Sequence, residues 1–109
     1  MRRGDIVTVA VGGDYGKPRP AVIVQTDAIP EIHASVIICQ MTSDISAAAD
    51  FRVRIEPSPE NGLRVQSQIM ADKPVTIRTA RLGTRIGRLT PPEVASLDAA
   101  LAFVLGLAD

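Results

Sequence analysis

Three segments in the first half of the chain carry the apolar residues that β-strands favour. They are residues 5–11 (DIVTVAV), 20–26 (PAVIVQT) and 35–42 (SVIICQMT), which are rich in Val and Ile. These side chains are stiff at χ1 and fit a pleated surface. The apolar run of 35–42 is nearly continuous, which predicts a strand that is covered on both faces.

The pattern continues into the second half with shorter apolar stretches. Residues 51–57 alternate strictly and predict a half-buried strand. Its two faces are Phe51, Val53 and Ile55 on one side and Arg52, Arg54 and Glu56 on the other. Residues 63–71 and 73–78 predict two further short strands, broken at Asp72–Pro74, and 43–50 predicts a short helical turn capped by Ser43 or Asp44.

The end of the chain has a different period. Thr90 and Glu93 form a capping box, with proline at the first helical position. Apolar residues then recur at helical spacing: Val94, Leu97, Leu101 and Val104 or Leu105. Gly106 is placed to end this helix. The chain is therefore predicted to be mainly β, with five or six short antiparallel strands in a small barrel covered by one C-terminal α-helix.

Composition narrows the class of protein. The 109 residues suit a single domain over 1–109, and 46% of them are apolar. No apolar run approaches the roughly 20 residues that span a bilayer, and the start lacks a secretory signal. The lone Cys39 excludes an internal disulfide and fits a reducing compartment, so we expect a cytoplasmic protein with no membrane contact. One Cys and one His are too few ligands for the usual structural zinc site, and no cofactor is expected.

The net charge is zero, with twelve basic and twelve acidic residues, but the charges are unevenly distributed. Between Asn61 and Pro92 there are six basic residues and a single acidic one, Asp72. Two interpretations fit this bias. It forms either a local anion-binding face or an ordinary solvated surface.

The candidate catalytic and binding residues are polar side chains at the ends of predicted strands. His33 lies in a polar connection and Cys39 in an apolar strand, and neither is expected to react. No helix follows the glycines of 12–16, so they are not a phosphate-binding loop. The remaining polar residues at or near strand ends are Arg19, Thr42, Ser43, Ser67, Gln68, Asp72 and Lys73.

Those side chains permit metal-free cleavage of RNA, as one possibility among several. A base removes the ribose 2′-OH proton, a cation stabilises the phosphate, and an acid protonates the leaving oxygen. Arg19 stands between Pro18 and Pro20, immediately before a strand. It is either a solvated edge charge or a cation held in position for a phosphate.

Several segments together resemble the MazF/PemK family of toxin endoribonucleases from toxin–antitoxin modules. The matching stretches cover nearly the whole chain: RGDIV (3–7), RPAVIVQTD (19–27), MTSD (41–44), GLRVQSQIMADKPVTI (62–77) and IGRLTPPEVASLDAALAFVLGL (86–107). Their order and spacing make the resemblance specific. It implies an SH3-like antiparallel barrel and a sequence-specific, metal-independent endoribonuclease acting on single-stranded mRNA.

The resemblance also assigns roles to particular residues. Arg19 matches the family's scissile-phosphate arginine, Thr42 its active-site threonine and Asp72 its catalytic aspartate, whereas Met70 stands where PemK-like members carry an arginine. The glycine-rich loop has no histidine, so the general acid stays open between Lys17, Tyr15 and Lys73. The residues expected to contact RNA are Lys17, Ser43, Gln68, Lys73 and Arg78.

The implied partners are a second copy of the chain, single-stranded RNA and a cognate antitoxin of the MazE kind. RNA is expected to lie across the homodimer interface, and the antitoxin to insert an acidic disordered segment into the same groove. One alternative is a non-catalytic toxin of the CcdB kind, which binds gyrase through a tryptophan that this chain lacks. Another is a degenerate nuclease that acts as a co-regulator.

Overall fold

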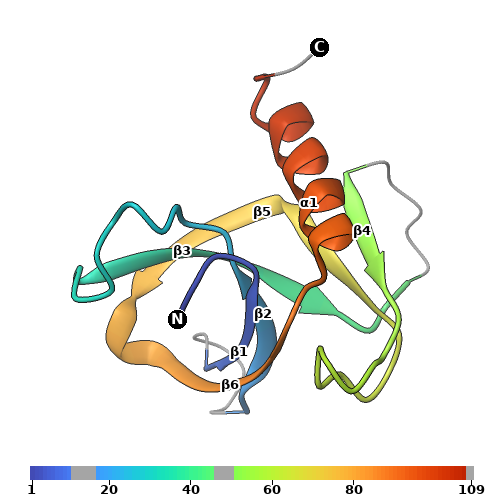
Figure 1. The fold of residues 1–109 in the computed structure, drawn as a ribbon, viewed down its shortest axis with the longest axis horizontal. Coiled ribbons are helices and arrows are strands. Elements are labelled where there is room, and N and C mark those ends of the chain that lie inside the picture. Colours follow the sequence, from blue (N-terminus) through green and yellow to red (C-terminus); the bar gives the residue numbers. More distant parts are fainter. Residues whose placement is uncertain (11–16, 46–50, 108–109) are drawn as a thin grey trace.

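The computed structural model describes residues 1–10, 17–45 and 51–107. Their regular elements are β1 (Asp5–Val9), β2 (Arg19–Ile23), β3 (Ser35–Thr42), β4 (Arg52–Ile55), β5 (Ser67–Arg78), a 3₁₀ turn η1 (Thr79–Arg81), β6 (Leu82–Arg88) and α1 (Pro91–Val104) (Figure 1). The predicted class, mainly β with one C-terminal helix, is confirmed.

The strands form one antiparallel sheet in the order β4-β5-β3-β2-β1-β6. The sheet curls so that β1, β2, β3, β5 and β6 enclose a ring, seen end-on in Figure 1. The two edge strands, β4 and β6, do not pair with each other, so the barrel is rolled but open. The first strand pairs with the last, with Asp5 opposite Arg88.

Two apolar cores lie on opposite faces of this sheet. One fills the inside of the roll and contains Val7, Val9 and Ile38. The other lies between the sheet and α1 and contains Cys39, Met41 and other residues of the outer face. Since Ile38 and Cys39 are neighbours on β3 and face different cores, β3 is covered on both sides, as its apolar run predicted.

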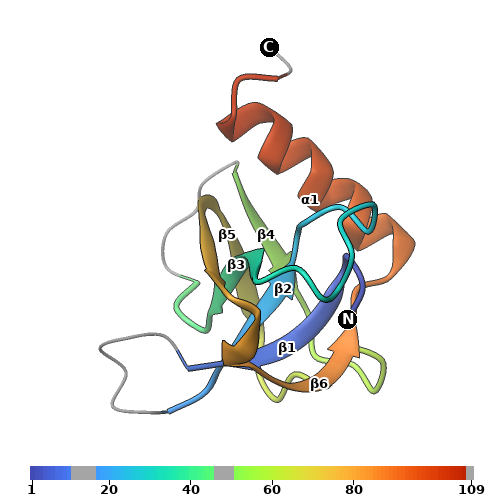
Figure 2. The same cartoon turned by 90° about the vertical axis from the view of Figure 1, so that its left-hand side faces the viewer.

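The helix α1 lies across β4 and β5 (Figure 2). Its capping box is present: Glu93 N donates to Thr90 Oγ1 at 3.3 Å, and Thr90 N donates to Glu93 Oε1 at 2.8 Å. Leu97, Ala100 and Leu101 form its buried stripe. Gly106 ends it with a φ of +71°, a left-handed conformation that glycine adopts without strain. Within the described residues no helix has the length and apolar content that a membrane crossing requires.

The predicted break at Asp72–Pro74 is wrong. β5 is one strand of 12 residues that starts at Ser67 rather than residue 63. Against β3, however, its register shifts between the pairs Met41–Ile69 and Cys39–Pro74. Pro74, opposite Cys39, is the first residue of β5 that pairs again after this bulge, and a proline, which has no N–H, is accommodated where the ladder is disrupted. The sequence pattern that predicted a break between two strands therefore corresponds to a bulge within one strand.

Strand β6 was missed by the sequence analysis, because LGTRIGR has too few apolar residues to show a period. It is held by backbone contacts instead. Arg88 N donates to Glu60 O at 2.9 Å, and a Cβ on Gly87 would lie 2.3 Å from the backbone carbon of Asn61. Glycine is needed there because the turn before β5 presses directly on the strand.

Three strands are shorter than predicted, and the predicted helical turn is only partly covered by the described residues. β1 ends at Val9, β2 ends at Ile23, and β4 spans Arg52–Ile55 rather than 51–57. After β2 the regular pairing stops because Val24 N and Gln25 N both donate to Ile37 O. Of the helical turn predicted for 43–50, residues 43–45 are not helical and 46–50 lie outside the described residues. His33 is exposed and Cys39 fully buried, as expected.

Candidate functional site

Arg19 is the first residue of β2, where its backbone pairs with Val9 of β1. Pro18 and Pro20 restrict the backbone on both sides, so the chain enters the strand in an extended conformation. The residue is exposed. The local sequence therefore delivers a guanidinium to the end of a strand at which the sheet is accessible.

Thr42 is the last residue of β3 and lies directly opposite Gln68 of β5. Gln68 in turn lies opposite Arg54 of β4. Residues that oppose each other in an antiparallel ladder project their side chains from the same face of the sheet. Thr42, Gln68 and Arg54 therefore form a line across three adjacent strands.

The β2–β3 ladder adds Arg19 to this line. Ala21 lies opposite Gln40, and Arg19 and Thr42 each lie two residues further along their strands, towards the same end. A step of two residues preserves the face of a strand. We name the resulting set, Arg19, Thr42, Gln68 and Arg54, the cross-strand row.

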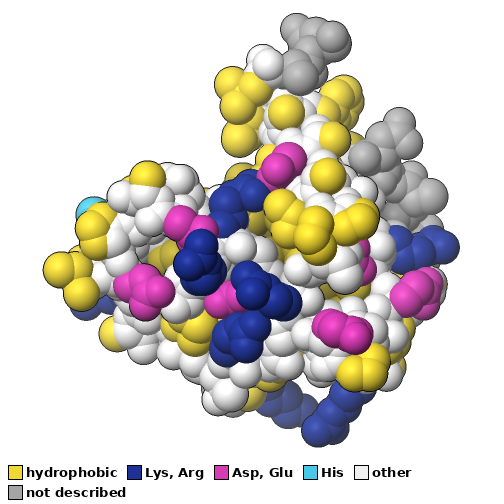
Figure 3. Space-filling model, viewed as in Figure 1, with side chains coloured by type: hydrophobic (Ala, Val, Ile, Leu, Met, Phe, Trp, Pro, Cys, Tyr) yellow, Lys and Arg dark blue, Asp and Glu magenta, His cyan; other side chains and the backbone are white. Residues whose placement is uncertain are grey.

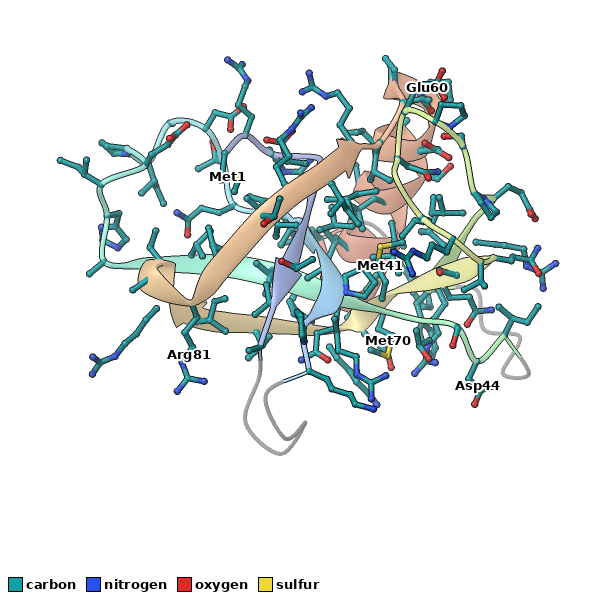
Figure 4. The ribbon with its side chains drawn as sticks, turned by 90° about the horizontal axis from the view of Figure 1, so that it is seen from below. Met1, Met41, Asp44, Glu60, Met70 and Arg81 are labelled. Carbon is teal, nitrogen blue, oxygen red and sulfur yellow. The ribbon has the colours of Figure 1, made fainter. Side chains whose placement is uncertain are left out.

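The cross-strand row lies on the face of the sheet that turns away from α1. Figure 4 shows Met41 and Met70 pointing to opposite sides of the strands that carry them. Met41 belongs to the core beneath α1, as does Ile69. Thr42 and Gln68 are the chain neighbours of these two core residues, so they occupy the other face, the one that Met70 shares.

The hydroxyl of Thr42 is oriented by the residue that follows β3. Asp44 N donates to Thr42 Oγ1 at 3.1 Å. A hydroxyl has one proton to donate in addition to its acceptor lone pairs. With an acceptor position engaged by Asp44, the Thr42 O–H can donate to an anion above the sheet.

Asp72 lies at the β5 bulge and forms an ion pair with Arg52 of β4. Arg52 Nε donates to Asp72 Oδ1 at 3.3 Å and Nη2 donates to Oδ2 at 3.4 Å. The side chains are 15% and 23% exposed, respectively. Nearby, burial first and the Asp72 carboxylate second raise the pKa of the Cys39 thiol to about 11, against an opposing effect of Arg3. A thiol in that state is an inert part of the core.

A hollow of about 590 Å³ reaches the row only at Arg19, since Thr42, Gln68 and Arg54 do not line it. Arg19 and Ser43 line it together with Leu63, Arg64 and Val65 of the segment before β5. Its wall combines exposed cations with apolar side chains, a surface that suits a ligand with both negative charge and apolar area. A smaller hollow of about 200 Å³ lies elsewhere, around Gln25 and Glu31, and none of the predicted site residues line it.

The other predicted RNA contacts are more scattered. Lys17 precedes Arg19 and is exposed, and Lys73 is exposed at the bulge of β5. Arg78 lies opposite Ser35 at the far end of β5 from Gln68, about 30 Å along the strand at the usual rise per residue. Tyr15 lies outside the described residues.

Part of the basic bias of the second half stabilises the fold. Asp5 is 4% exposed, and both Arg85 and Arg88 of β6 approach its Oδ1, at 3.3 and 3.7 Å. Beside them Arg3 pairs with Asp98 of α1 at 2.6 Å. Figure 3 shows basic side chains interleaved with acidic ones on this face. These arginines neutralise carboxylates of the fold. The anion-binding surface expected from the sequence is therefore assigned to the cross-strand row instead.

Arg52 and Arg54 are two residues to which the sequence pattern alone assigns no function. Alternation had placed both on the polar face of the strand, and that signal was correct. What alternation cannot supply is the identity of the neighbour on the next strand. The register assigns Arg52 to Met70 and Arg54 to Gln68, which brings Arg54 into line with Thr42.

In the part of the chain that the structure describes, no three His, Cys, Asp or Glu side chains gather in a way that could hold a metal ion. The groups assembled around the row are thus a guanidinium from β2, a hydroxyl from β3, an amide from β5 and the charged residues of β4. A guanidinium and a hydroxyl on one open face are suited to phosphate oxygens.

Comparison with known proteins agrees with this chemistry. A family model described as "PemK-like, MazF-like toxin of type II toxin-antitoxin system" matches residues 2–105. A probable endoribonuclease MazF of Mycolicibacterium smegmatis is 43% identical, over 99% of both chains. Endoribonuclease MazF9 of Mycobacterium tuberculosis is 34% identical, over 98% of both chains.

A solved structure shows the same fold. It is an endoribonuclease in complex with its cognate antitoxin from a mycobacterial species, with a TM-score of 0.84 and 25% identity. The superposition covers 100% of this chain and 98% of the other. The chain therefore belongs to the family of PemK-like and MazF-like toxins of type II toxin–antitoxin systems.

Proposed function

We propose that this protein is an endoribonuclease toxin that cleaves single-stranded mRNA at defined sequences and so inhibits translation and growth. The observation that carries the proposal is the placement of Arg19 beside Thr42 on one open face, in a chain whose 43% identical relative is named an endoribonuclease. Because mRNA is the substrate, the site of action is the cytoplasm.

The chemistry we propose is transesterification within the RNA. The 2′-oxygen of the ribose loses its proton and attacks the adjacent phosphorus, and the bond from phosphorus to the 5′-oxygen breaks. The products are a 2′,3′-cyclic phosphate and a 5′-hydroxyl. Arg19 stabilises the negative charge that accumulates on the phosphate oxygens, and the Thr42 hydroxyl orients one of them.

Proton transfer is assigned to residues near the row. Asp72 is the proposed base, and its ion pair with Arg52 leaves lone pairs available, because each carboxylate oxygen has two. Lys17 and Lys73 are exposed candidates for the acid that protonates the leaving 5′-oxygen, with Tyr15 a third. Ser43 and Arg78, both exposed, are proposed to contact the RNA, whereas Gln68, expected from the sequence to do so, is only 4% exposed and is proposed to lie beneath the RNA.

The proposed partners follow from the family. The solved relative is in complex with its cognate antitoxin, and we infer that this chain is likewise neutralised by an antitoxin of the MazE kind. An acidic, disordered segment of that antitoxin would bind the face that carries Arg19 and exclude RNA from it. We also propose that the toxin works as a homodimer, with RNA lying across the interface. No observation favours the gyrase-binding or the co-regulator alternative.

The experiment that tests the function is incubation of the purified protein with a long RNA in EDTA, followed by primer extension to map the cuts. Cleavage at a repeated short sequence, leaving 5′-hydroxyl ends, is the expected result. The Arg19→Ala variant, purified in parallel, controls for contaminating nucleases. Cleavage that requires an added divalent ion would overturn the proposed mechanism, and intact RNA at all concentrations would overturn the function.

A further inference from the structure

Arg54 extends the cross-strand row onto the edge of the sheet. It lies in the middle of β4, is exposed, and stands opposite Gln68, which itself stands opposite Thr42. Within the described residues, no carboxylate lies within ion-pair distance of its guanidinium. Its neighbour on the same face, Arg52, is by contrast bound to Asp72 through two hydrogen bonds.

We propose that Arg54 binds a backbone phosphate of the RNA next to the phosphate that is cleaved, an inference that rests on the endoribonuclease function proposed above. The cross-strand row would then be the path of the RNA strand. Its two ends, Arg19 and Arg54, are exposed cations, while its middle is neutral and polar and consists of the half-buried Thr42 and the buried Gln68, which is 4% exposed. The RNA would therefore pass over Gln68 without direct contact to it. This pattern matches a chain of phosphates that are separated by uncharged sugars and bases.

The distance between Arg19 and Arg54 across the sheet is compatible with a single RNA strand that contacts both. Neighbouring strands of a sheet lie about 4.8 Å apart, so the three steps from β2 to β4 amount to roughly 14 Å. An extended single strand of RNA covers that distance in a few nucleotides. The RNA is therefore expected to cross the strands, entering or leaving over the edge that β4 forms.

An acidic residue, Glu56, marks the end of the proposed RNA contact along the edge strand β4. Glu56 follows Arg54 by two residues, and its carboxylate accepts a hydrogen bond from Gln66. Its negative charge does not attract RNA, so Arg54 is the last cation of β4 on this path. A guanidinium is suited to this position because it presents a fork of donors to two phosphate oxygens.

The test compares Arg54→Ala with Arg81→Ala. Arg81 is exposed on η1, at the end of the sheet remote from Met70 (Figure 4), and its loss removes the same charge without touching the row. Binding is measured by fluorescence anisotropy with an RNA oligonucleotide that carries a 2′-deoxy group at the cleavage site, between 50 and 200 mM salt. One phosphate contact contributes about 0.7 to the slope of log Kd against log salt for single strands.

Arg54→Ala should lower this slope by about 0.7 and weaken binding about two- to fivefold at low salt. Arg81→Ala should keep the parental slope. Arg54→Lys should restore most of the slope, since a point charge serves a phosphate contact. In cleavage assays Arg54→Ala should raise KM and leave kcat near the parental value, because Arg54 is not at the reacting phosphate.

Trimming the oligonucleotide locates the contact. Removal of nucleotides from one side of the cleavage site should abolish the difference between parent and Arg54→Ala, and removal from the other side should preserve it. If the parent cleaves RNA but Arg54→Ala keeps the parental slope of log Kd against log salt, this inference is overturned and the proposed function stays intact. Weakened binding of an acidic peptide with unchanged binding of RNA also overturns this inference. A parent that cleaves no RNA overturns the proposed function instead.

Discussion

Arg52 and Asp72 face each other across β4 and β5, joined by two hydrogen bonds of 3.3 and 3.4 Å. Both side chains are largely shielded from water, at 15% and 23% exposure. The pair therefore connects the edge strand to the bulge of β5 in a place where solvent screens charges less than at the surface.

Either Arg52→Ala or Asp72→Ala should destabilise the fold, because each leaves a partly buried charge without its partner. A loss of about 1–3 kcal/mol in the free energy of unfolding is expected. Urea denaturation of the two single variants and the double variant measures the coupling. Additive losses would show that the pair contributes nothing beyond its separate side chains. If Asp72 is also the base, Asp72→Asn should reduce cleavage well beyond its effect on stability.

Arg19→Ala should lower the single-turnover cleavage rate by about 10²–10³, the usual cost of losing one preorganised electrostatic stabiliser. Arg19→Lys should recover little, because an ammonium cannot reproduce the bidentate fork. Rates are compared at saturating protein, with dimer content and melting temperature measured alongside. A rate within a few-fold of the parent would mean that Arg19 is only a solvated charge at a strand entrance.

Thr42→Ala should reduce the cleavage rate by less than Arg19→Ala, because a neutral donor stabilises charge less than a cation does. The Asp44 N–H loses its acceptor in this variant, but it lies at an exposed position where water replaces it, so the melting temperature should stay nearly constant. Thr42→Ser retains the hydroxyl and should retain most of the rate. Equal rates for alanine and serine at this position would remove the hydroxyl from the mechanism.

The stability of the protein should depend on Cys39 at alkaline pH. Burial first, and Asp72 second, raise the pKa of the thiol from 9.0 to about 11. The unfolded chain therefore loses its thiol proton at lower pH than the folded chain does. Stability is unaffected by this group below pH 9 and falls as the pH rises from 9 to 11, by about 2–3 kcal/mol over the whole window.

The measurement is the difference in unfolding free energy between the parent and Cys39→Ala, followed from pH 7 to pH 11. Subtraction removes the titration of lysines, which both proteins share. The difference should be constant up to pH 9 and then decline. A flat difference throughout would show that Cys39 is solvated enough to ionise normally in the folded protein.

The sequence correctly predicted those features of the fold that depend on residues close together in the chain. Alternation identified the faces of β4, the apolar run identified β3 as covered on both sides, and the capping box fixed the start of α1. Each of these signals is a relation between residues that are close in the chain. They were sufficient for the fold class because short strands and a terminal helix leave few ways to bury apolar surface.

The sequence could not predict relations between strands. β6 is fixed by a turn that presses on Gly87, a contact between segments far apart in the chain. The continuity of β5 through Pro74 depends on a bulge against β3. Likewise the family resemblance pointed to Arg19, Thr42 and Asp72, whereas the alignment of Arg54 with Thr42 needed the register of two ladders.

The pairing of β1 with β6 has a consequence for the order in which the protein folds. Asp5 and Arg88 meet only after a segment of about 80 residues has been closed into a loop, a step with a high entropic cost. Closure of the roll is therefore expected to be late and to limit the folding rate, as in other domains whose contacts are mostly non-local. The ladders that align Arg19, Thr42, Gln68 and Arg54 require none of β1 or β6. During synthesis on the ribosome these ladders can assemble before β6 has emerged, so the surface proposed to face RNA would begin to form before the domain is closed.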